Sequence, residues 1–178
     1  MHLFNQANNL LLRNDHVLFE NQVSERTLCG ALMLHIHDII KDDHSYAGYY
    51  ADVEYNRRKG KRNCDYKTIP TPNNNTIRIT CDLILHGRGK QSEQDNLLAI
   101  EMKKSTRTNR EKNSDRERLK ILTEDFYNNK QMVDTNILPE HVCGYVLGVY
   151  YEINYRRNMV LVEYYYKGEL LQTTEIQI

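Results

Sequence analysis

Three ionisable residues have the types and the spacing to carry out chemistry together: Asp82, Glu101 and Lys103. Glu101 and Lys103 lie in an apolar run, Leu97–Lys103, that is typical of a buried strand. Side chains two residues apart on a strand point to the same face, so this carboxylate and this amine lie side by side. Such a pair can bind a metal ion and activate a water molecule.

The element that must position Asp82 is a second strand, which we predict over Ile77–His86. Between the two strands, Gly87, Gly89 and Asp95-Asn96 supply a turn. If the strands pair, Asp82 comes opposite Glu101 and Lys103, and three charged groups meet at one point.

This pattern resembles the PD-(D/E)XK nuclease superfamily, in which an acidic residue on one strand is followed by an E-x-K on the next. Here it stands as Asp82 followed by Glu101-Met102-Lys103, with Cys81 in place of the proline of the family name. Three further segments look like small bacterial members of the superfamily: S-E-R-T-L at 24–28, E-Y-N-R at 54–57 and L-K-I-L-T at 119–123. The resemblance covers about residues 20–155. It implies an α/β protein with a restriction-endonuclease-like αβββαβ core, in which helices flank a mixed central sheet.

The resemblance also implies roles for the site residues. Asp82, Glu101 and the backbone carbonyl of Met102 would bind Mg²⁺, or Mn²⁺ in its place, and Glu25 of the first helix would complete the site. Lys103 would orient the attacking water or help to deprotonate it. The expected activity is metal-dependent hydrolysis of phosphodiester bonds in nucleic acid, with DNA favoured, which leaves 5′-phosphate and 3′-hydroxyl ends.

Other interpretations of the same residues stay open. An E-x-K on a strand is common as a solvent-facing ion pair, and Glu25 follows a predicted N-cap, Ser24, where the helix dipole favours a carboxylate. A nuclease-fold subunit that binds nucleic acid or assembles without cutting is one alternative, and a factor that recognises DNA ends is another. For an active enzyme, analogy favours an effector of phage defence or of mobile elements.

The composition, with 40% apolar and 27% charged residues, is that of one globular domain over residues 1–178. We expect residues 1–20 to be an N-terminal extension and residues 156–178 to form a C-terminal β-hairpin extension. The cysteines lack zinc-binding spacing and are expected to be free thiols. No apolar run is long enough for a membrane span and no cleavable leader is visible, so we expect a cytoplasmic protein without a membrane partner.

The formal net charge is zero, but basic residues are clustered in two stretches, 57–62 and 103–120. Clusters of this kind favour a nucleic-acid partner when they lie on one surface, although solvated loops are the plainer interpretation. Cutting both strands of a duplex would favour a homodimer, and assembly with a partner protein is the alternative. The candidate phosphate contacts are Arg57, Arg58, Lys61, Lys104 and Lys120.

Periodicity predicts the remaining elements. A helix over Gln22–Lys41 is capped by Ser24, and a polar loop after Lys103 leads to a second helix over Ser114–Asn128. In the second helix, Ser114 and Glu117 form the expected capping box. Its expected buried stripe is Leu119, Leu122 and Phe126. The predicted strands are Tyr49–Asn56, Cys143–Ile153, and the hairpin Met159–Tyr166 and Glu169–Ile176 around Lys167-Gly168.

Overall fold

A mixed sheet of six strands forms the centre of the protein, in the order β1-β6-β7-β8-β9-β10. The structure is a computed structural model, and it describes residues 1–178 except 59–64, 67, 71–75, 79, 91–93 and 125–143. β7 and β8 run parallel, and the other neighbouring strands run antiparallel. The strands are β1 (Tyr50–Val53), β6 (Leu83–His86), β7 (Asn96–Lys104), β8 (Leu147–Asn154), β9 (Met159–Tyr166) and β10 (Glu169–Gln177).

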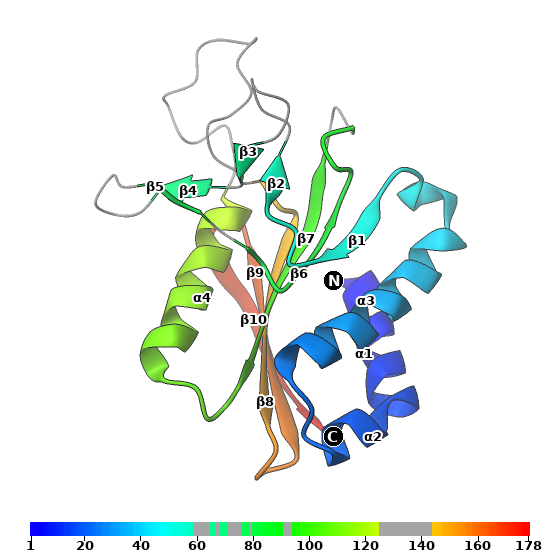
Figure 1. The fold of residues 1–178 in the computed structure, drawn as a ribbon, viewed down its shortest axis with the longest axis vertical. Coiled ribbons are helices and arrows are strands. Elements are labelled where there is room, and N and C mark those ends of the chain that lie inside the picture. Colours follow the sequence, from blue (N-terminus) through cyan, green and yellow to red (C-terminus); the bar gives the residue numbers. More distant parts are fainter. Residues whose placement is uncertain (59–64, 67, 71–75, 79, 91–93, 125–143) are drawn as a thin grey trace.

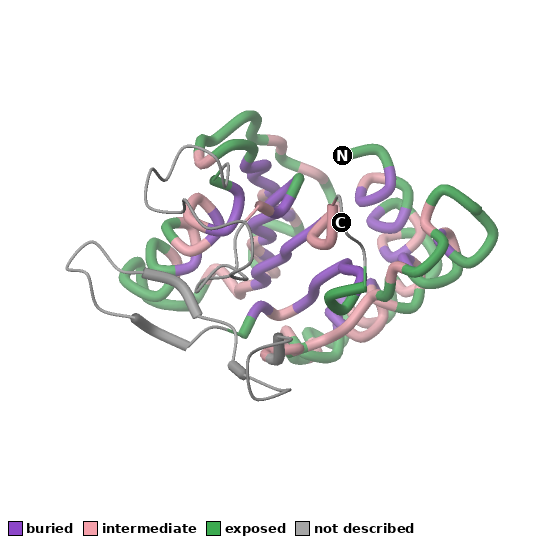
Figure 2. The backbone as a smooth tube through the Cα atoms, turned by 90° about the horizontal axis from the view of Figure 1, so that it is seen from above, coloured by how far each residue is buried: buried purple, intermediate pink, exposed green. Residues whose placement is uncertain are grey.

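Helices cover both faces of this sheet. α1 (His2–Asn14) and α3 (Glu25–Lys41) pack together on one face, and α4 (Asn109–Thr123) covers the other (Figure 1). Figure 2 shows the buried residues gathered in the central strands and on the helix faces that point toward them. The predicted mixed α/β class, with helices flanking a mixed sheet, is therefore confirmed. The shorter elements are α2 (His16–Glu20), the 3₁₀ helix η1 (His44–Tyr46), and two small hairpins, β2 (Arg57–Arg58) with β3 (Asp65–Tyr66) and β4 (Thr68–Pro70) with β5 (Thr76–Arg78).

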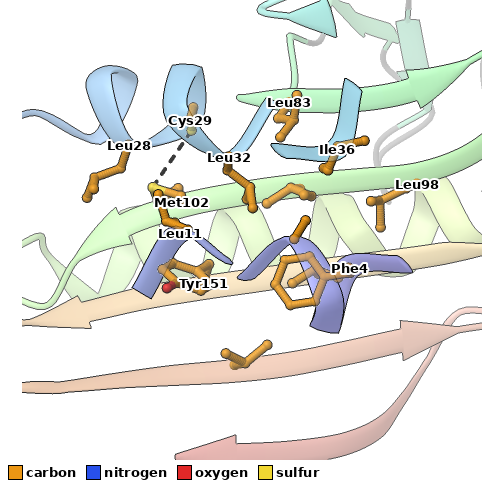
Figure 3. Close-up of a cluster of buried hydrophobic side chains, with 14 of the residues drawn as sticks. Phe4, Leu11, Leu28, Cys29, Leu32, Ile36, Leu83, Leu98, Met102 and Tyr151 are labelled. Carbon is orange, nitrogen blue, oxygen red and sulfur yellow. Dashed lines mark hydrogen bonds between the residues drawn. The ribbon is translucent and has the colours of Figure 1, made fainter. Parts of the chain in front are cut away.

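The main core lies between the sheet and the α1–α3 pair (Figure 3). Phe4 and Leu11 of α1 are buried there against Tyr151 of β8, while Leu32 of α3 faces Met102 of β7. The Phe4 and Tyr151 rings meet edge to face with their centroids 6.3 Å apart, a favourable aromatic geometry. The first twenty residues therefore contribute to the core, whereas we expected an extension. The reason is that the apolar residues of α1 recur every three or four positions along one helix face.

The N-terminal half of the predicted core forms much as expected. α3 begins at Glu25 rather than Gln22, and its cap is confirmed, since the backbone N–H of Thr27 donates to Ser24 Oγ at 3.1 Å. β1 is shorter than the predicted strand because Glu54 has a φ of 51°, which takes the backbone out of the extended region.

The predicted strand Ile77–His86 is wrong as one continuous element. Residues Thr76–Arg78 form β5 in a small separate hairpin, and the chain returns to the central sheet only at Leu83, where β6 begins. Asp82 lies in the break, where its side chain binds a backbone N–H of β7 instead of extending β6. A polar side chain that can bond locally to backbone groups favours such an interruption.

The start of the second helix is also corrected. α4 begins at Asn109, and so the second half of the predicted polar loop between Lys103 and Ser114 is helical. The capping box that forms is Thr108 with Glu111: the backbone N–H of Glu111 donates to Thr108 Oγ1 at 3.3 Å, and that of Thr108 donates to Glu111 Oε2 at 3.0 Å. The same T/S-x-x-E pattern occurs twice in this stretch, and the first copy is used. The predicted end of the helix, including Phe126, lies outside the described residues.

The C-terminal hairpin is confirmed. β9 and β10 pair around Lys167-Gly168, whose φ angles of 52° and 79° are those of a type I′ turn. The predicted strand Cys143–Ile153 is confirmed in part: β8 begins at Leu147, residues 144–146 are not in a strand, and Cys143 lies outside the described residues, as does Cys64. Cys29 and Cys81 are buried free thiols, as expected. Among the helices that the structure describes, none is both long and apolar enough to cross a bilayer.

Candidate active site at the free edge of β7

β7 is longer than the strand that pairs with it on one side, and part of its edge stays open as a result. Pairing with β6 ends where Leu83 meets Ile100, whereas β7 continues to Lys104 alongside β8. Backbone N–H groups beyond Ile100 on the β6 side must therefore find partners other than a strand, because buried N–H groups are rarely left unpaired. We call this segment, residues 101–104, the free edge of β7.

Two carboxylates from separate elements take the place of the missing strand. The backbone N–H of Met102 donates to Asp82 Oδ2 at 2.7 Å, and that of Lys104 donates to Glu25 Oε1 at 2.8 Å. Asp82 reaches the free edge from the break before β6, and Glu25 reaches it from the first turn of α3. The sheet geometry thus collects acidic side chains at the point where β6 is absent.

The ammonium group of Lys103 lies among oxygen atoms at this edge. Its Nζ is 3.4 Å from Asp82 Oδ2, 3.2 Å from the carbonyl oxygen of Met102 and 3.1 Å from Asp115 Oδ2. Burial opposes the positive charge, but the carboxylates of Asp82, Asp115 and Glu101 outweigh this effect and raise the pKa of Lys103 above its ordinary value. Lys103 is therefore a charged amine held by several oxygens.

Glu101 lies on the same face of β7 and has an arginine partner. Its side chain is only 1% exposed, and Arg118 Nη1 donates to Glu101 Oε1 at 3.0 Å. Burial raises the pKa of Glu101 well above its ordinary value, with Asp82 and Asp115 adding to the shift and Arg118 opposing it. The predicted common face of Glu101 and Lys103 is confirmed, since both contact α4.

Asp115 and Arg118 are site residues that the sequence analysis missed. Arg118 bridges the two acids, since its guanidinium also binds Asp115, and Asp115 in turn pairs with Lys103. One signal was available: Asp115, Leu119 and Leu122 recur at spacings of four and three, on the stripe of α4 that faces the sheet. An acid on a buried stripe needs a cationic partner, which points to Asp115.

Glu25 lies at the same edge of β7 as Asp82 and Lys103, but its side chain has different partners. Both of its oxygens accept hydrogen bonds from Arg107, at 3.2 Å each, in addition to the bond from the Lys104 backbone. Burial would raise its pKa, but the hydrogen bonds from Arg107 and Lys104 outweigh burial and hold the pKa of Glu25 below its ordinary value. Of the predicted site residues, Asp82, Met102 and Lys103 are in direct contact with one another. Glu25 binds the backbone N–H of Lys104, two residues further along the same edge of β7 from the N–H of Met102 that Asp82 binds.

The candidate phosphate contacts are in different places. Lys104 lies on the α3 side of the sheet, where its Nζ donates to the Gln22 carbonyl at 3.0 Å. Lys120 is partly exposed on α4 and pairs with Glu117 at 2.7 Å. Arg57 and Arg58 form β2, at the opposite end of the molecule from the β8–β9 turn (Figure 1), and Lys61 lies outside the described residues.

The oxygens at the free edge have the chemistry that a hard divalent cation prefers, namely carboxylate and backbone carbonyl. The Lys103 ammonium already lies among three such oxygens, Asp82 Oδ2, the Met102 carbonyl and Asp115 Oδ2. The residues therefore fit a cation site. In the described part of the chain, no three Asp, Glu, His or Cys side chains are arranged around one point as metal ligands, since Glu101 is turned toward Arg118.

Comparisons with models of protein families, with curated proteins and with solved structures found no match to this chain.

Proposed function

We propose that this protein is a metal-dependent nuclease of the PD-(D/E)XK type, which hydrolyses phosphodiester bonds of nucleic acid and favours DNA. The observation that supports this most strongly is the convergence of Asp82, the Met102 carbonyl and Lys103 at the free edge of β7, with contacts of 2.7–3.4 Å. Glu101 lies on the same face of the strand as Lys103, paired with Arg118.

The order of the elements supports the same proposal. α3, β1, β6, β7, α4 and β8 follow one another as helix, three strands, helix and strand, which is the αβββαβ order of a restriction-endonuclease-like core. The four strands are neighbours in that order in the sheet, with β8 parallel to β7. The small hairpins β2–β5 are an insertion between β1 and β6, and β9 with β10 extends the sheet at its other end.

In this proposal, Asp82, Glu101 and the Met102 carbonyl would hold a Mg²⁺ or Mn²⁺ ion. Such an ion, when bound, would lower the pKa of its water and offset charge on the phosphate. Asp115, 3.1 Å from Lys103 Nζ, would hold the ammonium group at the site. From there the ammonium could donate to the attacking water and to a phosphoryl oxygen.

Arg118 and Asp115 have positioning roles in the same proposal. Arg118 opposes the effect of burial on Glu101 and shifts the balance toward the carboxylate, the form needed to hold a cation, although the pKa of Glu101 stays well above its ordinary value. Asp115 has a charged partner on each side, Arg118 and Lys103, and its carboxylate orients both.

A nuclease-fold subunit that binds nucleic acid without cutting it is the second candidate. The observation that favours it is the pairing of Glu101 with Arg118, because this ion pair satisfies a proposed ligand from within the chain. A purely structural network of this kind would hold its geometry without any ion.

The test is cleavage of linear duplex, supercoiled and single-stranded DNA and of RNA, in Mg²⁺, Mn²⁺ or EDTA. Wild-type protein is compared with Asp82→Asn and Lys103→Gln, and with Asp38→Asn as a control, since Asp38 has a side chain 75% exposed on α3. We expect metal-dependent cleavage that Asp82→Asn and Lys103→Gln each reduce by at least about 100-fold, and that the control retains.

Two results would count against the proposal. Cleavage that persists in EDTA, or in Asp82→Asn, would show that the free edge of β7 is not the active site. Binding of nucleic acid without cleavage under every metal condition would instead support the second candidate.

A further inference from the structure

We infer that a second site, on the opposite face of β7 from Lys103, binds a phosphate group of the nucleic acid. This inference rests on the proposed function for the identity of its ligand, but the site itself is argued from its own residues. It is a cavity of about 380 Å³ lined by residues that include Gln22, Lys104, Ser105, Thr106, Tyr155 and Arg156. We call it the Lys104 pocket.

The Lys104 pocket lies where the parallel strands β7 and β8 end. Its walls come from residues that follow β7, from the β8–β9 turn and from the turn that precedes α3. Because Lys103 contacts α4 and Lys104 contacts the α3 side, the two adjacent lysines point to opposite faces of one strand. The pocket is therefore next to the candidate active site along the chain but distinct from it. The carboxyl ends of parallel strands are a common place for ligand sites in α/β proteins.

The charges that line the Lys104 pocket are positive. Lys104 donates to the Gln22 carbonyl at 3.0 Å and its Nζ lies 5.3 Å from the centre of the Tyr155 ring, and within the described chain it pairs with no carboxylate. Arg156 is exposed, and likewise has no ion-pair partner among the described residues. None of the described residues that line the pocket is acidic. Two cations thus face the cavity with their charge not neutralised.

Glu25, whose side chain binds the Lys104 backbone, does not cancel this charge. Glu25 accepts hydrogen bonds from Arg107 and from the Lys104 backbone, which occupy both of its oxygens. Its negative charge is therefore matched by Arg107, and the Lys104 ammonium and Arg156 remain in excess. An excess of two cations favours an anion that can accept from both, such as a phosphate.

Neutral donors complete the Lys104 pocket. Within the part of the chain that the structure describes, the hydroxyls of Ser105 and Thr106 make no hydrogen bond, so both can donate to phosphate oxygens. Tyr155 is held by its own hydroxyl, which donates to the Val23 carbonyl at 3.3 Å, and its ring lies beneath Lys104. The aromatic ring is therefore a fixed wall rather than a free surface for stacking a base, and the phosphate is the group that the pocket recognises.

The test is equilibrium binding of single-stranded DNA in EDTA, which prevents metal-dependent cleavage. One strand carries a 5′-phosphate and a second strand of the same sequence carries a 5′-hydroxyl. Arg156→Ala is compared with wild type and with Arg157→Ala, a matched control because Arg157 is the exposed neighbour in the same turn and does not line the pocket. Affinity is measured by fluorescence anisotropy at several salt concentrations.

We expect Arg156→Ala to weaken binding about threefold to tenfold and to lower the salt slope by roughly 0.7, the value for one lost phosphate contact on a single strand. Arg157→Ala should match wild type. A loss confined to the 5′-phosphorylated strand assigns the pocket to a terminal phosphate, and an equal loss for both strands assigns it to an internal phosphodiester. Equal affinity and equal slope in wild type and Arg156→Ala would overturn the inference while leaving the proposed function intact.

If wild-type protein binds neither strand, titration with inorganic phosphate decides the pocket by itself, and the cleavage test decides the proposed function separately. Saturable NMR shifts of Lys104 and Ser105 in wild type that are lost in Arg156→Ala would support it. Their absence would overturn it.

Discussion

Arg118 is the residue on which two buried acids depend. It contacts Glu101, whose side chain is 1% exposed, and Asp115, whose side chain is 5% exposed. Replacing it by methionine leaves both acids with one cation fewer in a buried setting, and breaking such a pair is strongly destabilising. We predict that Arg118→Met lowers the free energy of unfolding by about 3 kcal/mol, as measured by urea denaturation.

A double-mutant cycle separates charge from packing in this prediction. Adding Glu101→Gln to Arg118→Met removes the unpaired carboxylate, so part of the lost stability should return. Arg110→Met is the control, because Arg110 is an exposed arginine in the first turn of the same helix, and it should change stability by less than about 0.5 kcal/mol. Strictly additive effects of the two substitutions would show that the Glu101 charge is not what Arg118 compensates.

Glu25 provides a prediction for pH dependence. Because its pKa is held below its ordinary value of 4.5 in the folded protein, the carboxylate stabilises the fold above that pH. This stability is lost as the pH falls through the folded-state pKa. Glu25→Gln should therefore lower the free energy of unfolding by about 1–2 kcal/mol relative to wild type at pH 7. This difference from wild type should shrink as the pH is lowered below about 4.5. A deficit that stays constant between pH 7 and pH 3, by chemical denaturation, would contradict this account.

At the scale of elements, the contact of α4 with β8 depends on a glycine. A Cβ built on Gly148 would lie 3.0 Å from Thr123 Cγ2, 3.2 Å from Tyr165 Cβ and 3.4 Å from Leu119 Cβ. α4 carries Asp115 and Arg118, so its approach to the sheet also places these site residues. The absence of a side chain at position 148 thus contributes to building the candidate site.

Gly148→Ala should therefore be destabilising by about 1–3 kcal/mol, since packed cores do not accept an added carbon without shifting. The matched control is Gly30→Ala in α3, where a Cβ would meet nothing within 4 Å. Alanine is the better helix former, so this control should gain about 0.5–1 kcal/mol. Thermal unfolding followed by circular dichroism measures both changes. A Gly148→Ala protein with wild-type stability would show that α4 has room to move away from the sheet.

For the whole molecule, the decisive feature is that β6 is shorter than β7. The gap that it leaves allows α3 and the segment before β6 to bring Glu25 and Asp82 to the backbone of one strand. From the other face, α4 brings Asp115 and Arg118. The helices α3 and α4, which cover opposite faces of the sheet (Figure 1), therefore both supply side chains to the free edge of β7.

The same layering separates the two sites discussed above. Successive side chains of β7 alternate between the α4 face and the α3 face. Lys103 therefore points toward Asp115 in the candidate active site, and Lys104 lines the Lys104 pocket together with Arg156. A nucleic-acid strand that follows the end of β7 would meet both.

The sequence alone determined much of this protein, because the relevant signals are local. Strand alternation placed Glu101 and Lys103 on one face, Ser24 marked the start of α3, and Lys167-Gly168 defined the β9–β10 turn. Each of these depends on residues within a few positions of one another. The apolar run of β8 was identifiable in the same way.

Only the tertiary structure decided which residues complete the cluster. Asp115 and Arg118 join it because α4 packs on the face of β7 that carries Glu101 and Lys103. The start of α4 at Asn109, after the Thr108 cap, was also not predictable, because two equivalent capping boxes cannot be ranked without the packing that chooses between them. Asp82 leaves the predicted strand because a β7 N–H is available to it across the sheet. These outcomes depend on contacts between residues far apart in the chain. The free energies of such contacts cannot be predicted from a local sequence pattern.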